Sequence, residues 1–424
     1  MFNIKEIAAP RLGLSGLEPT LSDEERALQS AANRFALETM RPYAATLDRL
    51  TAEEVVAAGS PLFEYLQKFQ ASGLFNLDLL ASLQPEQMAR LLPLLLEELG
   101  YGDVGLTVLA IATSFPSFAA ALSGDPELLE RFKGLPGCWI ATQPDRGSDV
   151  LDMAGRETLR GSRQDRGNLV ARVDGDHVVI NGQTSEWVSA GPIAQCALAY
   201  LQCDYGQGIH RANGSLRLIG ILIPFDIPGV SKGKAHDKLG QRSMPQGAIY
   251  FDNVRVPRKY ILAGEDAADL SFYGALTFAN MEIACTLGGL ARASFEHALK
   301  YVHERRQGGA VLMDHQSVRL RVFDAWRKLE ACKAMARRVV DYNYGKNGPH
   351  FLASVTSKTF VTQSAYEVAD AAVQLMGANG LSREYPVEKL LRDARAALIE
   401  DGENNVLSLH GANHLSDWYR QHVG

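Results

Sequence analysis

The spacing of apolar residues changes twice along the chain. From about residue 21 to 132, apolar positions recur every three or four residues, as in "PEQMARLLPLLLEELGYGD" (85–103), which predicts amphipathic helices. Ser22 with Glu25 three residues later predicts a capping box at the first helix. Proline and glycine then gather in "KGLPGCW" (133–139), so we expect the first helical region to end there.

Between about Gly137 and Pro257 short runs rich in β-branched and aromatic residues replace the helical pattern. The runs "HVVING", "CALAYL", "LRLIGILIPF" and "AIYFDNVRV" are separated by Gly, Asp and Asn, the residues that favour turns. This pattern predicts a central all-β region.

After Pro257 the helical period returns and continues to the end of the chain. One candidate helix, roughly 271–307, exceeds the usual globular length and ends in "YVHERRQGG", with basic residues before two glycines. Apolar stripes on long helices need partners, so a helical bundle follows. The pattern predicts an N-terminal helical domain at 1–136, a central β-domain at 137–258 and a C-terminal helical bundle at 259–424.

Composition narrows the class of protein. The 424 residues are 46% hydrophobic and 22% charged, which is typical of a globular protein with more than one packed region. A net charge of -6 and a pI near 6.0 give no basic field, which argues against nucleic acid or an anionic membrane as the main partner. The N-terminus is unlike a signal peptide, and we expect no membrane span and a cytoplasmic location. The five cysteines lack C-x-x-C spacing, so we interpret them as reduced, mostly buried thiols.

Six motifs occur in order along nearly the whole chain. They are "TQPDRGSD" (142–149), "NGQTSEWVSAG" (181–191), "DKLGQRS" (237–243), "FDNVRVP" (251–257), "ERRQGGAVLMDHQSV" (304–318) and "QLMGANGLSREYPVEKLLRDAR" (374–395). Each is weak alone, but together they resemble the acyl-CoA dehydrogenase family. That resemblance implies a mainly α fold, with an N-terminal helical domain, a β-barrel middle domain and a C-terminal four-helix bundle.

The resemblance also implies an activity. It implies bound FAD, a homotetramer or homodimer, and α,β-dehydrogenation of an acyl thioester carried by CoA or by a carrier protein. Electrons would then pass to an electron-transfer flavoprotein.

The family pattern assigns cofactor contacts residue by residue. Thr142 matches the position that bonds the flavin pyrimidine edge, and Trp187 and Ser189 match the pair that covers the ring and bonds near its N5. Arg305 matches an arginine that pairs with the FAD pyrophosphate across a subunit interface. The resemblance further implies contacts from these residues: Ser148, Gln316, Gln374, Gly377, Glu403 and Asn405.

Each of these residues also has an ordinary structural interpretation. A tryptophan at a strand end is more often core, and an arginine in a last helical turn more often complements the helix dipole. Threonine and serine are common turn residues. It is the conjunction of the motifs that favours the flavin interpretation.

The run "IEDGENNVL" (399–407) contains the candidate base. Counted from the arginine that ends "RDAR", the family's catalytic carboxylate falls on Asp401, with Gly402 in the motif's glycine place. An aspartate is one methylene shorter than the usual glutamate, by roughly 1.5 Å. The alternative is that "EDGENN" only caps the last helix. Glu400 and Glu403 are the other possible carboxylates, and Glu400 is disfavoured because a neighbouring residue projects in another direction.

Two departures from the family pattern concern the substrate. Thr277 and Asn280 stand where an aspartate and an arginine usually contact the thioester arm; with Ser148 and Gly402 they complete the candidate substrate-binding set. The link "VLDMAGRETLRGSRQDRGNLVAR" (150–172) is long and rich in arginine, either for phosphate contacts or as solvated surface.

Other functions stay open at this point. One is a carrier-dependent or oxygen-using flavin oxidase or monooxygenase of the same fold, and another is a non-catalytic flavin-binding relative. No metal constellation is apparent in the sequence.

Overall fold

The computed structural model describes residues 21–76, 82–152, 167–346 and 348–423. Its N-terminal part is helical: α1 (Asp23–Phe35), α2 (Arg41–Leu47), α3 (Ala52–Val56), α4 (Pro61–Ser72), α6 (Pro85–Gly102), α7 (Val104–Ser123) and α8 (Pro126–Phe132). The predicted capping box is confirmed, because Ser22 Oγ accepts the Glu25 N–H at 3.2 Å while Glu25 Oε2 accepts the Ser22 N–H at 2.6 Å.

A single sheet follows in the chain. Its strands are β1 (Gly137–Ile140), β2 (Val170–Asp174), β3 (His177–Gln183), β4 (Cys196–Asp204), β5 (Leu218–Pro224), β6 (Val230–Lys232), β7 (Ile249–Pro257) and β8 (Ile261–Ala263). The hydrogen-bonded order is β6-β7-β3-β2-β4-β5-β8, with β1 parallel to β4. Within the described residues the order does not join β6 to β8. The four predicted strand runs are confirmed, and the sheet continues past Pro257 into β8.

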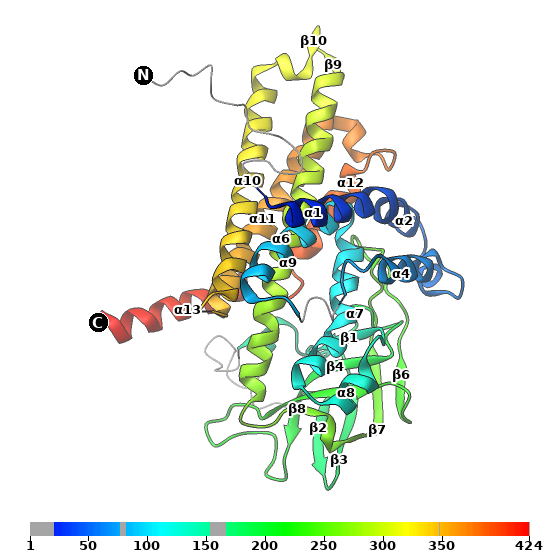
Figure 1. Cartoon of the computed structure of the whole chain (residues 1–424), viewed down its shortest axis with the longest axis vertical. Helices are drawn as coiled ribbons and strands as arrows, with labels where there is room; N and C mark the ends of the chain where they lie inside the picture. The colour runs from blue at the N-terminus through cyan, green and yellow to red at the C-terminus, as the bar shows by residue number, and fades with distance from the viewer. Residues whose placement is uncertain (1–20, 77–81, 153–166, 347, 424) are drawn as a thin grey trace.

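Long helices form the rest of the molecule. They are α9 (Ala268–Glu304), α10 (Gln316–Tyr344), α11 (Phe351–Met376), α12 (Val387–Ala397) and α13 (Asn404–His422), with a small hairpin of β9 (Arg306–Gln307) and β10 (Ala310–Val311) after α9. The long helix predicted at 271–307 is confirmed to within three residues at each end. Figure 1 shows the sheet and the hairpin at opposite ends of the long axis, with α9 running between them and α13 projecting to one side.

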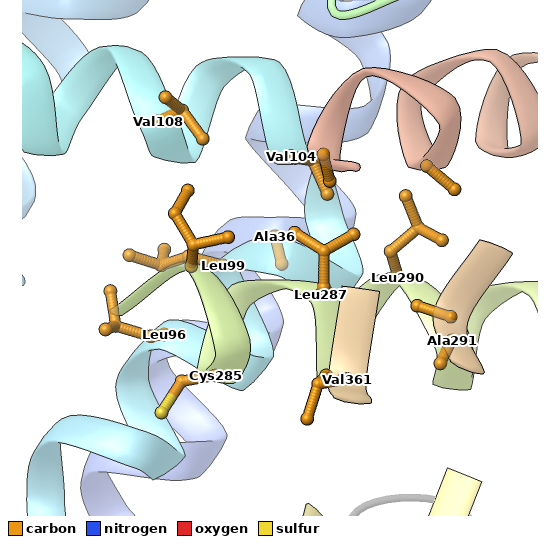
Figure 2. Packing of buried hydrophobic residues seen from close by; sticks show 14 of the residues in the cluster. Ala36, Leu96, Leu99, Val104, Val108, Cys285, Leu287, Leu290, Ala291 and Val361 are labelled. Atoms are coloured by element: carbon orange, nitrogen blue, oxygen red, sulfur yellow. The ribbon is translucent and has the colours of Figure 1, made fainter. Parts of the chain in front are cut away.

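Two glycines allow α6 and α9 to approach closely. A Cβ on Gly100 would lie 2.0 Å from the backbone oxygen of Thr286, and one on Gly289 would lie 2.0 Å from that of Glu97. Around this crossing, apolar side chains from α6, α7, α9 and α11 form one core, as Figure 2 shows. The sequence could not have indicated which glycines these would be, because the contacts join distant parts of the chain.

Among the described residues, α7 (Val104–Ser123) is the one helix long and apolar enough to cross a membrane by length and composition alone. Its most apolar window is 67% buried inside the protein, which is typical of a core helix. All five cysteines are buried and free, as predicted.

Candidate functional site

A cavity of about 840 Å³ lies where the sheet, α7, α9 and the segment after α12 meet. Its polar wall includes five residues predicted for the site: Thr142, Ser148, Trp187, Ser189 and Asp401, with Gly402 beside them. The apolar part of the wall is formed by Val108, Ile111, Ala112, Phe115, Trp139, Phe272, Leu276 and Ile283. The fold therefore brings together residues that are 260 positions apart in sequence.

Hydroxyl groups and an indole form one side of the cavity. Thr142 Oγ1 lies 2.6 Å from Ser185 Oγ, and the Ser185 N–H donates to the Thr142 carbonyl at 3.0 Å. The backbone N–H of Trp187 donates to Ser185 Oγ at 3.3 Å, and the Trp187 side chain stacks on the His236 ring with 5.6 Å between centroids. This places a polar edge and a flat aromatic face next to each other.

The Trp187 side chain tests whether a flavin fits this wall. A tryptophan is usually well buried, yet Trp187 is 59% exposed and lines a cavity of about 840 Å³. An aromatic face left open beside hydroxyl groups suits a flat heteroaromatic ring with a polar edge. The residues present therefore fit the isoalloxazine ring of FAD.

Ser189 belongs to a second polar group on the same wall. Gln246 donates through Nε2 to Ser189 Oγ at 3.3 Å and to the Trp187 carbonyl at 3.2 Å, while Lys238 Nζ donates to Gln246 Oε1 at 2.8 Å. Burial lowers the pKa of Lys238 to about 8, against the opposing effect of the Glu400 and Asp393 carboxylates. Lys238 thus adds an ionisable cation to the cavity wall.

The segment opposite this wall is a tight turn. Asp401 has φ 52° and Gly402 has φ 100°, so two successive residues adopt left-handed backbone conformations. A side chain at Gly402 would be strained, since a Cβ there would lie 2.9 Å from Leu407 and 3.0 Å from Leu151. The "DG" pair of the sequence therefore has a structural reason, independent of any chemistry.

Asp401 is held by its backbone and faces the cavity. Asn280 Nδ2 on α9 donates to the Asp401 carbonyl at 3.0 Å. Burial raises the pKa of the Asp401 carboxyl, and the Lys358 ammonium opposes that rise. A buried carboxylate with a raised pKa is what a general base needs to take a proton from a weak carbon acid.

Glu400 also lines the cavity, so the expectation that it projects elsewhere is wrong. Asp401 itself adopts a left-handed backbone conformation, and its charge acts on the Glu400 carboxyl, so the two carboxyl groups lie near each other. Gln241 Nε2 donates to Glu400 Oε1 at 2.7 Å. Burial and the neighbouring Asp401 charge raise the pKa of Glu400 to about 7.

Glu403 has a different role, the one that the cap interpretation assigns to the run. Its carboxylate accepts the N–H groups of Asn405 and Val406 at 2.9 and 3.1 Å, and so caps α13. Asn405 Nδ2 also donates to Glu403 Oε1, at 2.9 Å. The Glu403 N–H in turn donates to Ser148 Oγ at 3.0 Å. The cap and the cavity carboxylates are therefore separate residues of one run.

The two α9 residues predicted to contact substrate are buried beside the cavity. Thr277 Oγ1 donates to the Tyr273 carbonyl within α9, at 2.7 Å. Asn280 is occupied with the Asp401 backbone. In the described part of the chain neither residue lines the cavity, whereas Leu276 and Ile283 of the same helix do.

Four residues predicted to bind cofactor lie far from this cavity. Arg305 follows the end of α9, Gln316 begins α10, and Gln374 and Gly377 lie at the end of α11. All four are exposed. Asn379 Nδ2 donates to Tyr301 Oη at 3.0 Å, which ties the segment after α11 to the last turns of α9. The four predicted cofactor residues therefore gather at the end of the bundle opposite the sheet (Figure 1).

Most of the arginine-rich link lies outside the described residues. Arg156, Arg160, Arg163 and Arg166 fall in 153–166, and the described Arg172 is an exposed residue of β2, 3.8 Å from Asp174. Gln143, within the motif "TQPDRGSD", is buried, and its Oε1 accepts the Leu169 N–H at 2.8 Å. Gln143 thus holds the chain where the described part resumes after the link.

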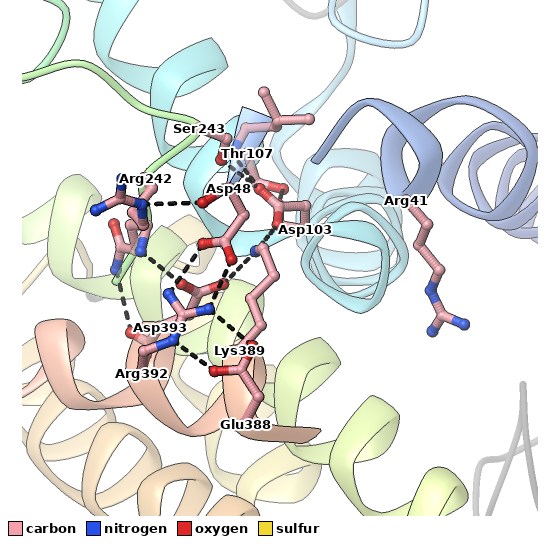
Figure 3. A network of polar contacts seen from close by, with 12 residues as sticks. Arg41, Asp48, Asp103, Thr107, Arg242, Ser243, Glu388, Lys389, Arg392 and Asp393 are labelled. Atoms are coloured by element: carbon pink, nitrogen blue, oxygen red, sulfur yellow. Dashed lines mark hydrogen bonds and ion pairs between the residues drawn. The ribbon is translucent and has the colours of Figure 1, made fainter. Parts of the chain in front are cut away.

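A network of polar contacts joins the start of α7 to α12, as Figure 3 shows. Lys389 bonds to Asp393, at 2.6 Å, and to Asp103, the N-cap of α7. Asp393 accepts the backbone N–H of Gln241, the residue whose side chain holds Glu400. Gln241 itself has φ 49°. Glu400 is thereby connected to a network of charged side chains that begins at α7.

Several polar residues at or near this site were not predicted from the sequence, among them Lys358, Glu282 and Gln241. Lys358 is the single lysine of α11, and it lies on the helix face of the buried Ser354, Val355, Val361 and Thr362. Glu282 is the one acid between Asp269 and Glu296 on α9; burial and the Asp401 charge raise its pKa to about 8. Gln241 stood within a quoted motif. A charged residue on an otherwise apolar helix face was the available signal for the first two.

Among the residues that the structure describes, no group of three or more His, Cys, Asp or Glu side chains could hold a metal ion. The chemistry of the cavity rests on its carboxyl groups, its lysine and the polar groups around Trp187.

Comparison with known proteins identifies family models and relatives that this chain matches. Two family models match, described as acyl-CoA dehydrogenase, middle domain (residues 138–254) and acyl-CoA dehydrogenase, C-terminal domain (residues 271–416). Benzylmalonyl-CoA dehydrogenase of Aromatoleum aromaticum is 30% identical over 93% of this chain and 99% of its own length. Cyclohexane-1-carbonyl-CoA dehydrogenase of Geobacter metallireducens is 28% identical, over 92% and 96%. A solved structure of glutaryl-CoA dehydrogenase from Mycobacterium smegmatis in complex with FADH2 shares the fold, with TM-score 0.76 and 22% identity over 94% of this chain and 95% of that one.

Proposed function

The chain belongs to the acyl-CoA dehydrogenase family of FAD-dependent oxidoreductases, and we propose that it oxidises its acyl-CoA with Asp401 as the base. The observation that carries this proposal is the shared cavity, in which Asp401 and Gly402 face Thr142, Trp187 and Ser189.

The reaction follows from what each group can do. The Asp401 carboxylate takes the proton from the carbon α to the thioester, and the electron pair of that C–H bond becomes the new Cα=Cβ bond. FAD, when bound, supplies the acceptor for the hydride that leaves the β carbon. The acyl group is oxidised by two electrons, and the proton stays on Asp401 until solvent removes it. By the family pattern, the Asp401 N–H helps to bind the thioester oxygen.

Cofactor binding is divided between two ends of the molecule. Thr142, Trp187, Ser189 and Ser148 would hold the flavin part of FAD within this cavity. Because Arg305, Gln316, Gln374 and Gly377 are exposed at the far end of the bundle, they would contact the FAD of a neighbouring subunit. This supports a homodimer or homotetramer in which each cofactor site is completed by the partner.

The acyl group we propose is compact and carries a ring or a branch. Phe115, Trp139 and Phe272 give the apolar wall an aromatic character. The two relatives described above are named for benzylmalonyl-CoA and cyclohexane-1-carbonyl-CoA. A carboxylate that is about 1.5 Å shorter than glutamate also favours an acyl carbon held close to the turn.

Purified holoenzyme mixed anaerobically with a panel of straight, branched and ring-bearing acyl-CoAs tests the proposal. We expect the flavin absorbance to bleach, fastest with a ring-bearing or branched acyl group. Absence of bleaching with every thioester would overturn the proposed function. Bleaching by straight chains alone would overturn only the substrate class.

The carrier-dependent and oxygen-using alternatives stay predictions. The rate at which the reduced flavin reacts with dioxygen distinguishes a dehydrogenase from an oxygen-using enzyme. After reduction by an acyl-CoA, a dehydrogenase that holds its product reacts slowly with dioxygen, so stopped-flow mixing with air should show slow reoxidation. An electron-transfer flavoprotein as acceptor and a cytoplasmic location are the further parts of this proposal.

A further inference from the structure

Lys358 occupies a position that the reaction described above does not yet use. It lies on α11 with a relative exposure of 0%. Its Nζ donates to the Gly402 carbonyl at 2.7 Å and to Asn404 Oδ1 at 2.8 Å. Asn404 Nδ2 donates onward to Thr362 Oγ1 at 3.0 Å, one turn along the same helix. A buried lysine is thus bonded to the residue that follows the base and to the first residue of α13.

The Asp401–Gly402 turn is held from two sides. Asn280 on α9 bonds the Asp401 carbonyl at 3.0 Å, and Lys358 on α11 bonds the next carbonyl, that of Gly402. Left-handed conformations in successive residues persist when surrounding contacts fix them. These two hydrogen bonds fix the direction in which the short Asp401 side chain enters the cavity.

The charges around Lys358 are mostly acidic. Asp401, Glu400 and Glu403 face it, Glu282 faces Asp401 from α9, and Lys238 faces Glu400 from across the cavity. Burial lowers the pKa of Lys358 to about 8, against the opposing effect of these carboxylates. Burial raises the pKa of Asp401, and Lys358 opposes that rise.

We propose that Lys358 is a positioning residue for the dehydrogenation: its bonds to Gly402 and Asn404 aim Asp401, and its ammonium charge favours the ionised form of that carboxylate. This inference rests on the proposed role of Asp401 as base. It assigns Lys358 no contact with substrate or with FAD.

Exchange of the substrate α-proton isolates the proton step. Holoenzyme is incubated anaerobically with the best acyl-CoA in D2O from pD 5.5 to 8.5, and deuterium incorporation is measured by mass spectrometry, with FAD content and thermal midpoint recorded for each variant. We expect Lys358→Gln to move the acidic limb of the exchange profile to higher pH, with roughly a tenfold loss of rate at pH 6, because a nearby cation lowers a carboxyl pKa. Lys358→Arg should restore the limb toward its wild-type position.

A second variant separates aim from charge. Asn404→Ala removes one acceptor of Lys358 and keeps the charge, so the rate should fall several-fold at every pH while the limb stays in place. Lys328→Gln, on the surface of α10, is the matched control and should change neither quantity. If Lys358→Gln does not accumulate as holoenzyme, Lys358→Arg and Asn404→Ala decide.

Two results have different consequences. A Lys358→Gln holoenzyme with a wild-type pH profile and rate would overturn the role of Lys358, even if its thermal midpoint falls. Wild-type exchange that survives in Asp401→Asn would instead overturn the proposed function, because another group would then be the base.

Discussion

The side-chain amide of Asn280 donates a hydrogen bond to the backbone carbonyl of Asp401, 3.0 Å away, and so joins α9 to the turn that carries the candidate base. A residue expected to contact substrate supports the base instead. The turn, with φ 52° at Asp401 and φ 100° at Gly402, depends on such contacts for its shape.

Lengthening the side chain of the candidate base should slow the reaction. Asp401→Glu would move the carboxylate by about 1.5 Å, and a displacement of about 1 Å can cost roughly 100-fold in rate. We expect anaerobic flavin bleaching to slow by about 10- to 100-fold with the preferred acyl-CoA, and Asp401→Asn to slow it further, both with normal FAD content. A faster Asp401→Glu enzyme would show that the cavity was shaped for a longer carboxylate.

Glu400 should make stability depend on pH. Its pKa rises from an ordinary 4.5 to about 7 in the folded protein, so the native state binds this proton more tightly than the unfolded chain does. The contribution of Glu400 therefore becomes unfavourable as pH rises from about 4.5 to about 7 and stays so above that.

Glu400→Gln tests this effect, since glutamine keeps an oxygen that can accept from Gln241. The thermal midpoint of the variant minus that of the wild type should be near zero at pH 5 and become positive by pH 8. A difference that does not change with pH would contradict the prediction.

Lys389 should be important for stability. It bonds to Asp103 and Asp393, which are 3% and 1% exposed, so Lys389→Met leaves two buried carboxylates without their cation. Breaking a buried pair in this way costs about 3–5 kcal/mol. Denaturant unfolding of the apoprotein measures this loss in the free energy of unfolding.

Lys328→Met is the surface control for that experiment. Lys328 pairs with Asp324 and Glu367 at 3.1 and 2.8 Å, with all three side chains about one-third exposed or more, and such pairs contribute about 0–1 kcal/mol. Equal losses for the two variants would show that the Figure 3 network is no more stabilising than a surface pair.

Replacing Arg305 should weaken FAD binding without changing the fold. Loss of a hydrogen bond to a charged group costs about 1.5–3 kcal/mol, so Arg305→Ala should bind FAD roughly 10- to 100-fold more weakly, measured by flavin fluorescence after gel filtration. The exposed Arg420→Ala is the control. Unchanged FAD affinity in an intact oligomer would refute a contact across subunits.

Local sequence patterns predicted much of the fold and part of the site. The Ser22 capping box, the strand runs and the long helix depend on neighbours within a few residues. The motifs predicted Asp401, Thr142 and Trp187 as site residues, and all three line one cavity.

What the sequence did not predict depends on distant contacts. Lys358 bonds a carbonyl 44 positions away. Asp401 adopts a positive φ, which aspartate does more readily than most non-glycine residues, but the Asp-Gly pair does not by itself indicate that Glu400 lines the cavity. Thr277 could have faced either way from a buried helix, and its hydroxyl bonds within the helix.

The length of α9 limits where residues can be inserted into the protein. Asn280 lies about a third of the way along this helix and Arg305 just past its C-terminal end, about 37 Å apart at 1.5 Å per residue. Inserting one residue between them would advance the far end by about 1.5 Å and rotate it by about 100°, turning Arg305 away from its expected partner while leaving Asp401 in place. Given the role proposed for Arg305, a change in the length of α9 would therefore alter the cofactor site of a neighbouring subunit without altering the base of its own.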